Sequence, residues 1–401
     1  MDVAFVFLIA GIIIMAGFFG NVFFEKTKIS DVLLLLCIGI FLGPVLGLIE
    51  PQILAPFAEY FGTLALIIIL FEGGMDMDID KLLKEFGTAS LLVLLSFTIS
   101  TVSLACFLHF VRGWDLLLSL LLGAILGCTS APVVIPIINK MGIKEETKTL
   151  LSIESALSDV LAVICTISLI EIITLGYIGI KTPFRTIFSS FSIAIVLGLV
   201  AGLFWLKILN HFSARKYAYM FTLAAVLTTF GAVSFLGGSG AMAILVFGII
   251  LGNSHDFSKF LKIKNTSLVN STIKFFHGEM TFFIRTFFFV YIGMMVSFSW
   301  IDLDFVLCSL ALLLIIVVVR YMSVGVTVAL YPEKKNDRGL MMSMLPRGLA
   351  SAVLATLPAS ANIRGSEYFT DLTFAIIIFT NLIMTVGVFV AGKKEPTKGG
   401  H

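Results

Sequence analysis

Two carboxylates, Glu154 and Asp159, lie in the middle of a long apolar run. Their segment reads Glu154-Ser155-Ala156-Leu157-Ser158-Asp159, with Leu150-Leu151-Ser152-Ile153 before it and apolar residues at 160–164 after it. A charge at the centre of a bilayer costs about 2.5–3.5 kcal/mol on insertion scales, and chains that keep such groups usually use them to bind or move an ion. A carboxylate held by a structural partner is the other interpretation, and it suits Glu154 better than Asp159.

Hydroxyl groups surround Asp159 in the sequence. On a helix Ser155 lies one turn from Asp159 and shares its face, while Ser158 is its neighbour in the chain. Thr129 and Ser130, which lie at an expected helix break, can complete an oxygen shell. Carboxylate, hydroxyl and carbonyl oxygens suit a hard cation such as Na⁺. Because a desolvated carboxylate holds either a proton or a cation, competition for Asp159 is the simplest way to build an exchanger.

Glu154 needs a partner of its own, since it points about 140° away from Asp159 at about 100° per residue. Arg347 is the candidate, because a buried pair of this kind is physically reasonable. Arg285 is a second cation within an apolar segment, and it either compensates helix dipoles or pairs with an acid. Arg320 is expected near a segment end, with its side chain snorkelling to the interface.

The composition is that of a polytopic membrane protein. The chain is 59% hydrophobic and 13% charged, whereas soluble domains are about 25% charged, and its mean hydropathy is +1.07. The formal net charge of +2, without basic clusters among aromatic residues, argues against nucleic-acid binding. The cysteines are isolated and no histidine accompanies a carboxylate or serine in an apolar segment, so the sequence predicts neither an enzyme nor a bound cofactor.

The sequence predicts an all-α fold of about 13 transmembrane helices, at about 20 residues per crossing. We expect residues 1–391 to form one transporter unit with core and dimerisation helices interleaved in sequence, and 392–401 to form a short cytoplasmic tail. The expected segments cover 3–24, 31–49, 53–71, 87–110, 115–138, 149–174, 187–209, 217–236, 238–253, 272–298, 304–330, 339–358 and 368–391.

The basic residues predict the orientation. With the N-terminus outside, nearly all lysines and arginines of the connecting loops fall on the inner side, which leaves Arg112, Lys181, Arg185 and Arg364 outside. Positive charge marks the cytoplasmic side of a membrane protein. We therefore expect an integral protein of the cell's inner (plasma) membrane, with the N-terminus outside and the C-terminus in the cytoplasm.

Two of these segments carry matching breaks. The fifth contains Gly127-Cys128-Thr129-Ser130-Ala131-Pro132, and the twelfth contains Pro346-Arg347-Gly348-Leu349-Ala350-Ser351. Proline and glycine interrupt helices, and such backbone is kept away from lipid. Because the breaks lie an odd number of segments apart, they run through the membrane in opposite directions, as in an inverted repeat. A fainter echo links Phe71-Glu72-Gly73-Gly74-Met75 with Phe289–Met294. Inverted repeats with discontinuous helices are a transporter architecture.

With these motifs the chain resembles the cation/proton antiporter superfamily, most closely its prokaryotic sodium/proton antiporter branch. The acid-serine-x-x-polar-aspartate motif carries most of the resemblance, in order with the other pieces. The matching pieces are Leu42-Gly43-Pro44, Leu70–Met75, Thr129 with the proline after it, Glu154–Asp159, Arg285–Phe289 and Pro346–Ala350.

The resemblance implies a homodimer in the lipid bilayer whose fifth and twelfth helices cross near their unwound middles. It implies that Asp159 alternately binds the cation and the proton, with Thr129, Ser155 and Ser158 beside it, and that Glu154 pairs with Arg347. It also implies elevator-like alternating access, in which a core domain slides against a fixed dimer interface, and a role in pH homeostasis.

Two departures from the family pattern bear on the transported ion. The branch often has Thr-Asp-Pro at the first break, whereas Ser130 stands there in this chain, and Ser158 replaces the usual asparagine before Asp159. The single carboxylate predicts electroneutral exchange of Na⁺ or Li⁺ for H⁺. A K⁺/H⁺ antiporter, or a K⁺ efflux subunit regulated by a separate soluble protein, is the alternative, and a cation channel is the second alternative.

Overall fold

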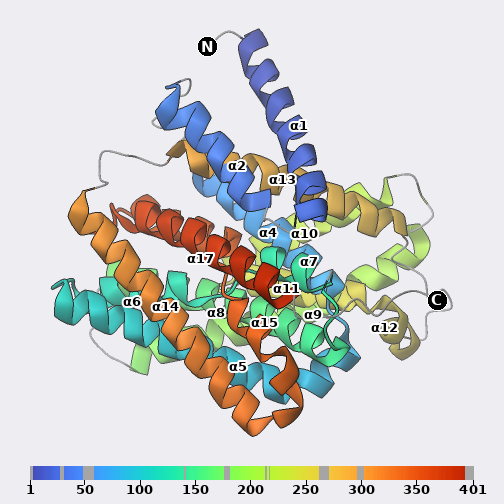
Figure 1. Ribbon diagram of the computed structural model, residues 1–401. Helices are drawn as coiled ribbons and strands as arrows, with labels where there is room; N and C mark the ends of the chain where they lie inside the picture. The colour runs from blue at the N-terminus through green and yellow to red at the C-terminus, as the bar shows by residue number, and fades with distance from the viewer. Residues whose placement is uncertain are drawn as a thin grey trace, which may run out of the picture. The chain divides into compact units, whose positions relative to one another are not determined.

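The computed structural model describes residues 3–27, 31–47, 58–139, 141–175, 181–212, 215, 217–261, 271–295 and 302–392, and every regular element in these ranges is a helix (Figure 1). The helices are α1 (Val3–Thr27), α2 (Asp31–Ile40), η1 (Phe41–Val45), α4 (Ala58–Asp76), α5 (Ile79–Cys106), η3 (Phe107–Val111), α6 (Leu116–Gly127), α7 (Ala131–Asn139), α8 (Glu145–Leu175), α9 (Lys181–Phe212), α10 (Ala218–Phe235), α11 (Gly240–Gly252), α12 (Ser254–Phe260), α13 (Ser271–Met295), α14 (Leu303–Leu330), η4 (Pro332–Asp337), α15 (Arg338–Ser343), α16 (Leu349–Ser360) and α17 (Phe369–Gly392).

The predicted all-α membrane fold is confirmed. Each expected apolar segment contains a helix, although residues 48–49, 53–57 and 296–298 of the expected segments lie outside the described residues. Within the described residues, 6 helices are long and apolar enough to cross a membrane on their own. Further apolar stretches of helix in the described residues are shorter, namely Phe7–Gly20, Leu33–Val45, Leu116–Gly127, Gly240–Gly252 and Leu349–Ser360. The expected segments 115–138 and 339–358 are each divided between two α-helices, α6 with α7 and α15 with α16.

The chain forms two compact units, each drawn from separate stretches of sequence. The first comprises Met1–Glu59, Glu85–Ile170 and Thr286–His401, and the second comprises Tyr60–Lys84 and Glu171–Arg285. The expectation that residues 1–391 act as a single transporter unit stays a prediction.

In the first unit, α16 and α17 pack against α6, and α14 packs against α17 (Figure 1). Glycines bring α2 and η1 close to the end of α13. A Cβ on Gly39 would overlap the backbone of Val290 and Gly293, and one on Gly43 would overlap Met294. Small residues at such spacing allow helix backbones to approach closely in a membrane protein, where packing supplies much of the helix association energy.

In the second unit, α11 packs against α9 and α10. Its core is apolar and includes Phe71, Trp205 and Phe247. Glycines again set a close helix contact, because a Cβ on Gly248 would overlap Phe71 and Gly74, and one on Gly252 would overlap Met75.

The two glycine contacts correspond to one another in sequence. Gly39 and Gly43 follow the pattern Gly-Ile-Phe-Leu-Gly, and Gly248 and Gly252 follow Gly-Ile-Ile-Leu-Gly. Gly293 and Gly74, which they contact, belong to the two segments whose echo indicated an internal repeat. The contact of α2 and η1 with the end of α13 in the first unit thus corresponds to the contact of α11 with α4 in the second unit.

Candidate functional site

The two predicted helix breaks are present, and they meet within the first unit. Helix α6 ends at Gly127 and α7 begins at Ala131, while α15 ends at Ser343 and α16 begins at Leu349. The backbone N–H of Ser130 donates a hydrogen bond to the carbonyl of Pro346 at 2.9 Å. Backbone groups that the helices leave unpaired thus satisfy one another, as the cost of burying them requires.

Asp159 lies on α8 beside the first break and is 4% exposed. Its Oδ2 accepts a hydrogen bond from the N–H of Ala131 at 3.2 Å, so the carboxylate faces the N-terminus of α7. A helix N-terminus stabilises negative charge through its free N–H groups and its dipole. Within the described part of the chain, Asp159 Oδ1 and the hydroxyl of Ser130 are buried without a hydrogen-bond partner. Both oxygens are available to a bound ion.

The other predicted oxygen ligands hold the break in shape. Ser158 accepts a hydrogen bond from the Thr129 N–H at 3.0 Å, and its hydroxyl can donate to the carbonyls of Ser155 at 2.9 Å and Thr129 at 3.3 Å. The Ser155 hydroxyl donates to the carbonyl of Ser152 at 3.1 Å, which leaves its lone pairs free. Ser158 therefore positions the segment that carries Thr129 and Ser130.

Glu154 is fully buried and its ion-pair partner is Arg320, at 2.8 Å from Oε1. The same oxygen accepts hydrogen bonds from the hydroxyls of Thr129 at 3.2 Å and Ser96 at 3.5 Å, whereas Oε2 has no partner in the described residues. The predicted pair with Arg347 is wrong.

The expected position of Arg320 is also wrong. Arg320 is 3% exposed and lies ten residues before the last residue of α14, Leu330. Ten residues of helix are about 15 Å long, too far for its side chain to reach the end of the helix. Its Nε donates to the carbonyl of Met341 at 2.9 Å, so the guanidinium joins α15 to Glu154.

Arg347 instead binds carbonyl groups. Its Nε donates to Leu126 O at 2.7 Å and its Nη1 to Leu345 O at 3.0 Å. Leu126 belongs to the last turn of α6, where unpaired carbonyls carry partial negative charge. The backbone of Arg347 is held in turn by α17, because its N–H donates to Thr380 Oγ1 at 3.0 Å and its carbonyl accepts from Asn381 Nδ2 at 2.8 Å.

Arg285, the other predicted coupling residue, belongs to the second unit. It is half-buried on α13 and is an electrostatic neighbour of Glu72 on α4. Asp76 lies one turn further along α4 and is a second neighbour of Glu72. These charges form a polar cluster within the second unit, and the coupling role of Arg285 stays a prediction.

Two acidic and two basic side chains are buried around the two breaks, namely Glu154 and Asp159 with Arg320 and Arg347. Across the described ranges, no group of three or more His, Cys, Asp or Glu side chains could hold a metal ion. Asp159 Oδ1 and Glu154 Oε2 both lack a hydrogen-bond partner in the described residues, and the hydroxyl groups near them are neutral.

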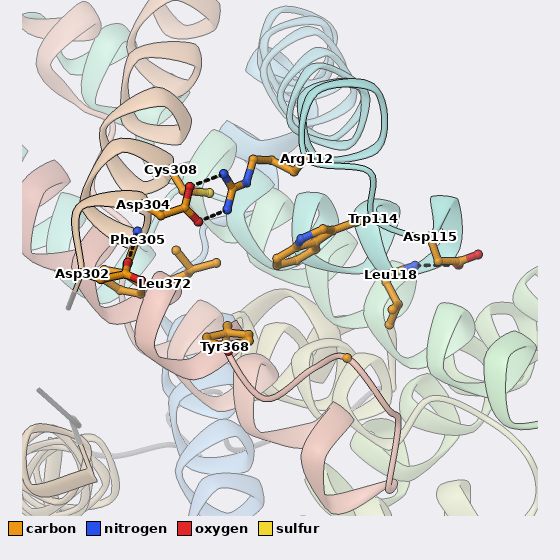
Figure 2. Close-up of a pocket in the computed structure, with 11 residues that line it drawn as sticks. Arg112, Trp114, Asp115, Leu118, Asp302, Asp304, Phe305, Cys308, Tyr368 and Leu372 are labelled. Carbon is orange, nitrogen blue, oxygen red and sulfur yellow. Dashed lines mark hydrogen bonds and ion pairs between the residues drawn. The ribbon is translucent and has the colours of Figure 1, made fainter. Parts of the chain in front are cut away.

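A separate cavity of about 640 Å³ opens in the first unit at the N-terminal ends of α6, α14 and α17 (Figure 2). Its three carboxylates are already engaged. Asp115 and Asp302 cap α6 and α14, and both oxygens of Asp304 accept hydrogen bonds from Arg112. Trp114, in the wall, stacks on Phe369. These engagements fit a structural role at the helix ends.

Sequence reasoning missed several polar residues of the site. Thr380 and Asn381, an adjacent polar pair in the last apolar segment, gave a signal that could have been followed. Ser96 gave no comparable signal, because single serines are frequent in membrane helices. Cys128 and Ser351 lie inside the two predicted breaks, and their side chains are 3.3 Å apart.

Comparisons with known proteins identify the family. Residues 9–394 match the transmembrane sodium/hydrogen exchanger family. A probable Na⁺/H⁺ antiporter 2 of Methanocaldococcus jannaschii is 27% identical over 83% of this chain and 79% of its own length. Na⁺/H⁺ antiporter 1 of the same organism is 26% identical over 90% of this chain and 87% of its own length. The K⁺/H⁺ antiporter NhaP2 of Shewanella sp. (strain ANA-3) is 27% identical over 84% of this chain, which spans 57% of that relative.

The fold has a solved counterpart. A structure of the sodium proton antiporter MjNhaP1 from M. jannaschii at pH 8 superposes with a TM-score of 0.79, at 23% identity, and covers 98% of this chain and 97% of that one. The fold, the buried polar site and the family match over nearly the whole chain lead to one conclusion: this integral membrane protein belongs to the sodium/hydrogen exchanger family, whose members are antiporters rather than enzymes.

Proposed function

We propose that this protein exchanges Na⁺ or Li⁺ for H⁺, with Asp159 binding the cation and the proton in turn. One observation carries the proposal: Asp159 is buried, one of its oxygens is held by the α7 N-terminus, and the other has no partner in the described residues. A buried carboxylate oxygen without a partner is costly unless an ion or a proton joins it. Because both compete for the same oxygen, binding of one releases the other.

The neighbouring oxygens complete the proposed site. Ser130 supplies its unpartnered hydroxyl, and Ser155 supplies the lone pairs left by its bond to Ser152. Thr129 and Ser158 contribute chiefly by fixing the shape of the break, since their polar groups bond to one another and to Glu154. All of these ligands except Asp159 are neutral.

The charge balance supports one-for-one, electroneutral exchange. With Asp159 empty, the four buried charges of the site cancel, and either a proton or a monovalent cation adds one positive charge. The site therefore carries the same net charge in both loaded forms. Moving either form across the membrane transfers the same charge, so a full cycle moves none.

An elevator-like movement is consistent with where the site residues lie. The two breaks, Asp159, Glu154, Arg320 and Arg347 all belong to the first compact unit. A displacement of that unit as a body would carry the site intact from one side to the other. We further propose a homodimer in the inner membrane with its N-terminus outside, as the family resemblance and the distribution of lysine and arginine predict.

The test is dissipation of a pH gradient in proteoliposomes. Na⁺, Li⁺ and K⁺ are added in turn to vesicles that contain the wild type or Asp159→Asn, and a voltage-sensitive dye follows the membrane potential. We expect saturable gradient dissipation with Na⁺ and Li⁺, no potential, and no activity in the variant. Gradient dissipation that persists in Asp159→Asn would contradict the proposal, and a potential generated by exchange would contradict the stoichiometry.

Exchange of K⁺ for H⁺ is the second candidate. Two observations favour it: the similarity to K⁺/H⁺ antiporters of Shewanella and the neutral Ser130 at the first break. A single carboxylate holds a cation less strongly than two, which lowers the advantage of a small ion such as Na⁺. Gradient dissipation with K⁺ but not with Na⁺, in the same assay, identifies this case, whereas flux that does not saturate identifies a channel.

A further inference from the structure

A cysteine and a serine connect the two helix breaks through their side chains. Cys128 directly follows the last residue of α6 in an extended conformation, and Ser351 lies in the first turn of α16. Both are buried, at 1% and 0% exposure, and Cys128 Sγ lies 3.3 Å from Ser351 Oγ. The backbone hydrogen bond from Ser130 to Pro346 joins the same two breaks, and Arg347 Nε donates to Leu126 O beside the first of them.

The Ser351 hydroxyl is directed to the contact with Cys128 and away from its own helix. A serine in the first turn of a helix commonly bonds to nearby backbone, and Gly348, at the N-cap of α16, supplies no side-chain cap. Ser351 nevertheless has Cys128 as its one hydrogen-bond partner among the residues described. The hydroxyl therefore serves the contact between the breaks rather than the end of its own helix.

The contact also borders the proposed ion site. The Cys128 thiol is an electrostatic neighbour of the Asp159 carboxylate, and two residues further along the chain lies Ser130, whose hydroxyl is buried without a partner. Gly348 leaves room for that hydroxyl, because a Cβ there would overlap the Ser130 side chain. A shift of Cys128 relative to Ser351 would thus move Ser130 relative to Asp159.

We propose that Cys128 and Ser351 form a positioning pair that sets the spacing of the two breaks around Asp159 and thereby the apparent affinity for the transported cation. This inference rests on the proposed function. The pair does not ligate the ion; it fixes the distance between the oxygens that do. Sulfur is large and polarizable and tolerates variable contact distances, so the contact persists while the site alternates between cation and proton.

The test is a double-mutant cycle in proteoliposomes, run with the full chain and with whichever of Na⁺, Li⁺ and K⁺ the wild type transports best. Cys128→Ala and Ser351→Ala are each expected to raise the cation KM by about 3- to 10-fold, the range expected for one lost hydrogen bond. The value of kcat should change little. The double variant should be no worse than the more affected single variant, because both substitutions remove the same contact.

Two further variants separate positioning from general stability. Cys128→Ser keeps a hydroxyl to pair with Ser351, and we expect its KM to stay within about 2-fold of wild type. Cys165→Ala removes a thiol from α8 that takes part in none of the site contacts described above, and it should leave KM unchanged.

Two results would overturn the inference. The first is a cation KM near the wild-type value in both alanine variants, even if their melting temperatures fall. The second is a double variant whose KM rises by the product of the two single increases, which would show that the two residues act independently. If Cys128→Ala does not fold, Ser351→Ala decides alone, by a raised or an unchanged KM. If the wild-type protein exchanges no monovalent cation, the proposed function is also wrong. If the wild type is active and the variants have its KM, only this inference is wrong.

Discussion

Glu154 and Asp159 are two buried carboxylates on the same helix, five residues apart, with different surroundings. One oxygen of Glu154 receives an ion pair from Arg320 and hydrogen bonds from Thr129 and Ser96. Asp159 receives one backbone N–H, from Ala131, and no ion pair within the described residues. Each retains one oxygen without a partner, so the difference lies in how the negative charge is compensated.

That difference separates a carboxylate fixed by an ion pair from the one that we propose binds the transported ion. A guanidinium that is itself bonded to Met341 O cannot leave Glu154 without exposing two buried charges, so this pair is fixed. Asp159 has no such fixed partner, because its Oδ2 accepts a hydrogen bond from the N-terminus of α7 and Arg347, its charged neighbour, is itself bonded to carbonyl groups. In the proposed function, a proton or a cation comes and goes at Asp159 while the pair of Glu154 and Arg320 stays in place.

The substitution Asp159→Asn should have the largest effect on transport and a small effect on the fold. The amide is nearly isosteric and can still accept the hydrogen bond from Ala131, but it offers no negative charge for a cation or proton. We expect complete loss of Na⁺- and Li⁺-dependent gradient dissipation, with a melting temperature close to that of wild type. Residual exchange in Asp159→Asn would contradict the assignment of ion binding to Asp159 rather than Glu154.

The substitution Glu154→Gln, unlike Asp159→Asn, should have a large effect on the stability of the fold. It leaves Arg320 buried without a counter-charge, and breaking a buried pair in this way costs about 3–5 kcal/mol. We expect a lower folded yield and a lower melting temperature in detergent. The double variant Glu154→Gln/Arg320→Gln should recover part of the loss, because neither charge is then left alone. A stable Glu154→Gln protein would contradict the structural assignment.

Local patterns of the sequence predicted much of this site. The apolar run around Glu154–Asp159 identified the ionisable helix, and the glycines and prolines near Thr129 and Arg347 identified the two breaks, because backbone preferences are local properties. The repeated glycine pattern at Gly39 and Gly248 was equally visible, although what each glycine contacts required the structure.

The choice between Arg320 and Arg347 could not be read from sequence. Both are single arginines in apolar segments, and the pairing depends on which helices are neighbours in space. Packing of α14 against α15 and α17 brings Arg320 to Glu154, while α17 holds the backbone of Arg347 so that its side chain turns to α6. Family resemblance favoured the residue beside the break, and tertiary contacts decided otherwise.

The substitution Ser130→Ala should raise the cation KM moderately, and it tests whether the Ser130 hydroxyl binds the cation beside Asp159. It removes a hydroxyl that has no partner in the described residues, so the fold loses little. If this oxygen binds the cation, its loss should raise the cation KM by about 3- to 10-fold, as for one lost polar contact. Thermal stability is the control. An unchanged KM would restrict the ligands to Asp159 and Ser155.

The smallest effect should come from Arg112→Gln, which removes the bidentate pair of Arg112 with Asp304, an ion pair in a different setting from that of Arg320 and Glu154. The side chains of Arg112 and Asp304 are 29% and 61% exposed, against 3% and 0% for Arg320 and Glu154. An exposed pair is worth about 0–1 kcal/mol, because water compensates both charges after the partner is lost. We expect a melting temperature close to wild type and unchanged exchange. If Arg112→Gln and Arg320→Gln destabilised the protein equally, burial would not be what makes the Glu154 pair structural, and the contrast with Asp159 would need another physical basis.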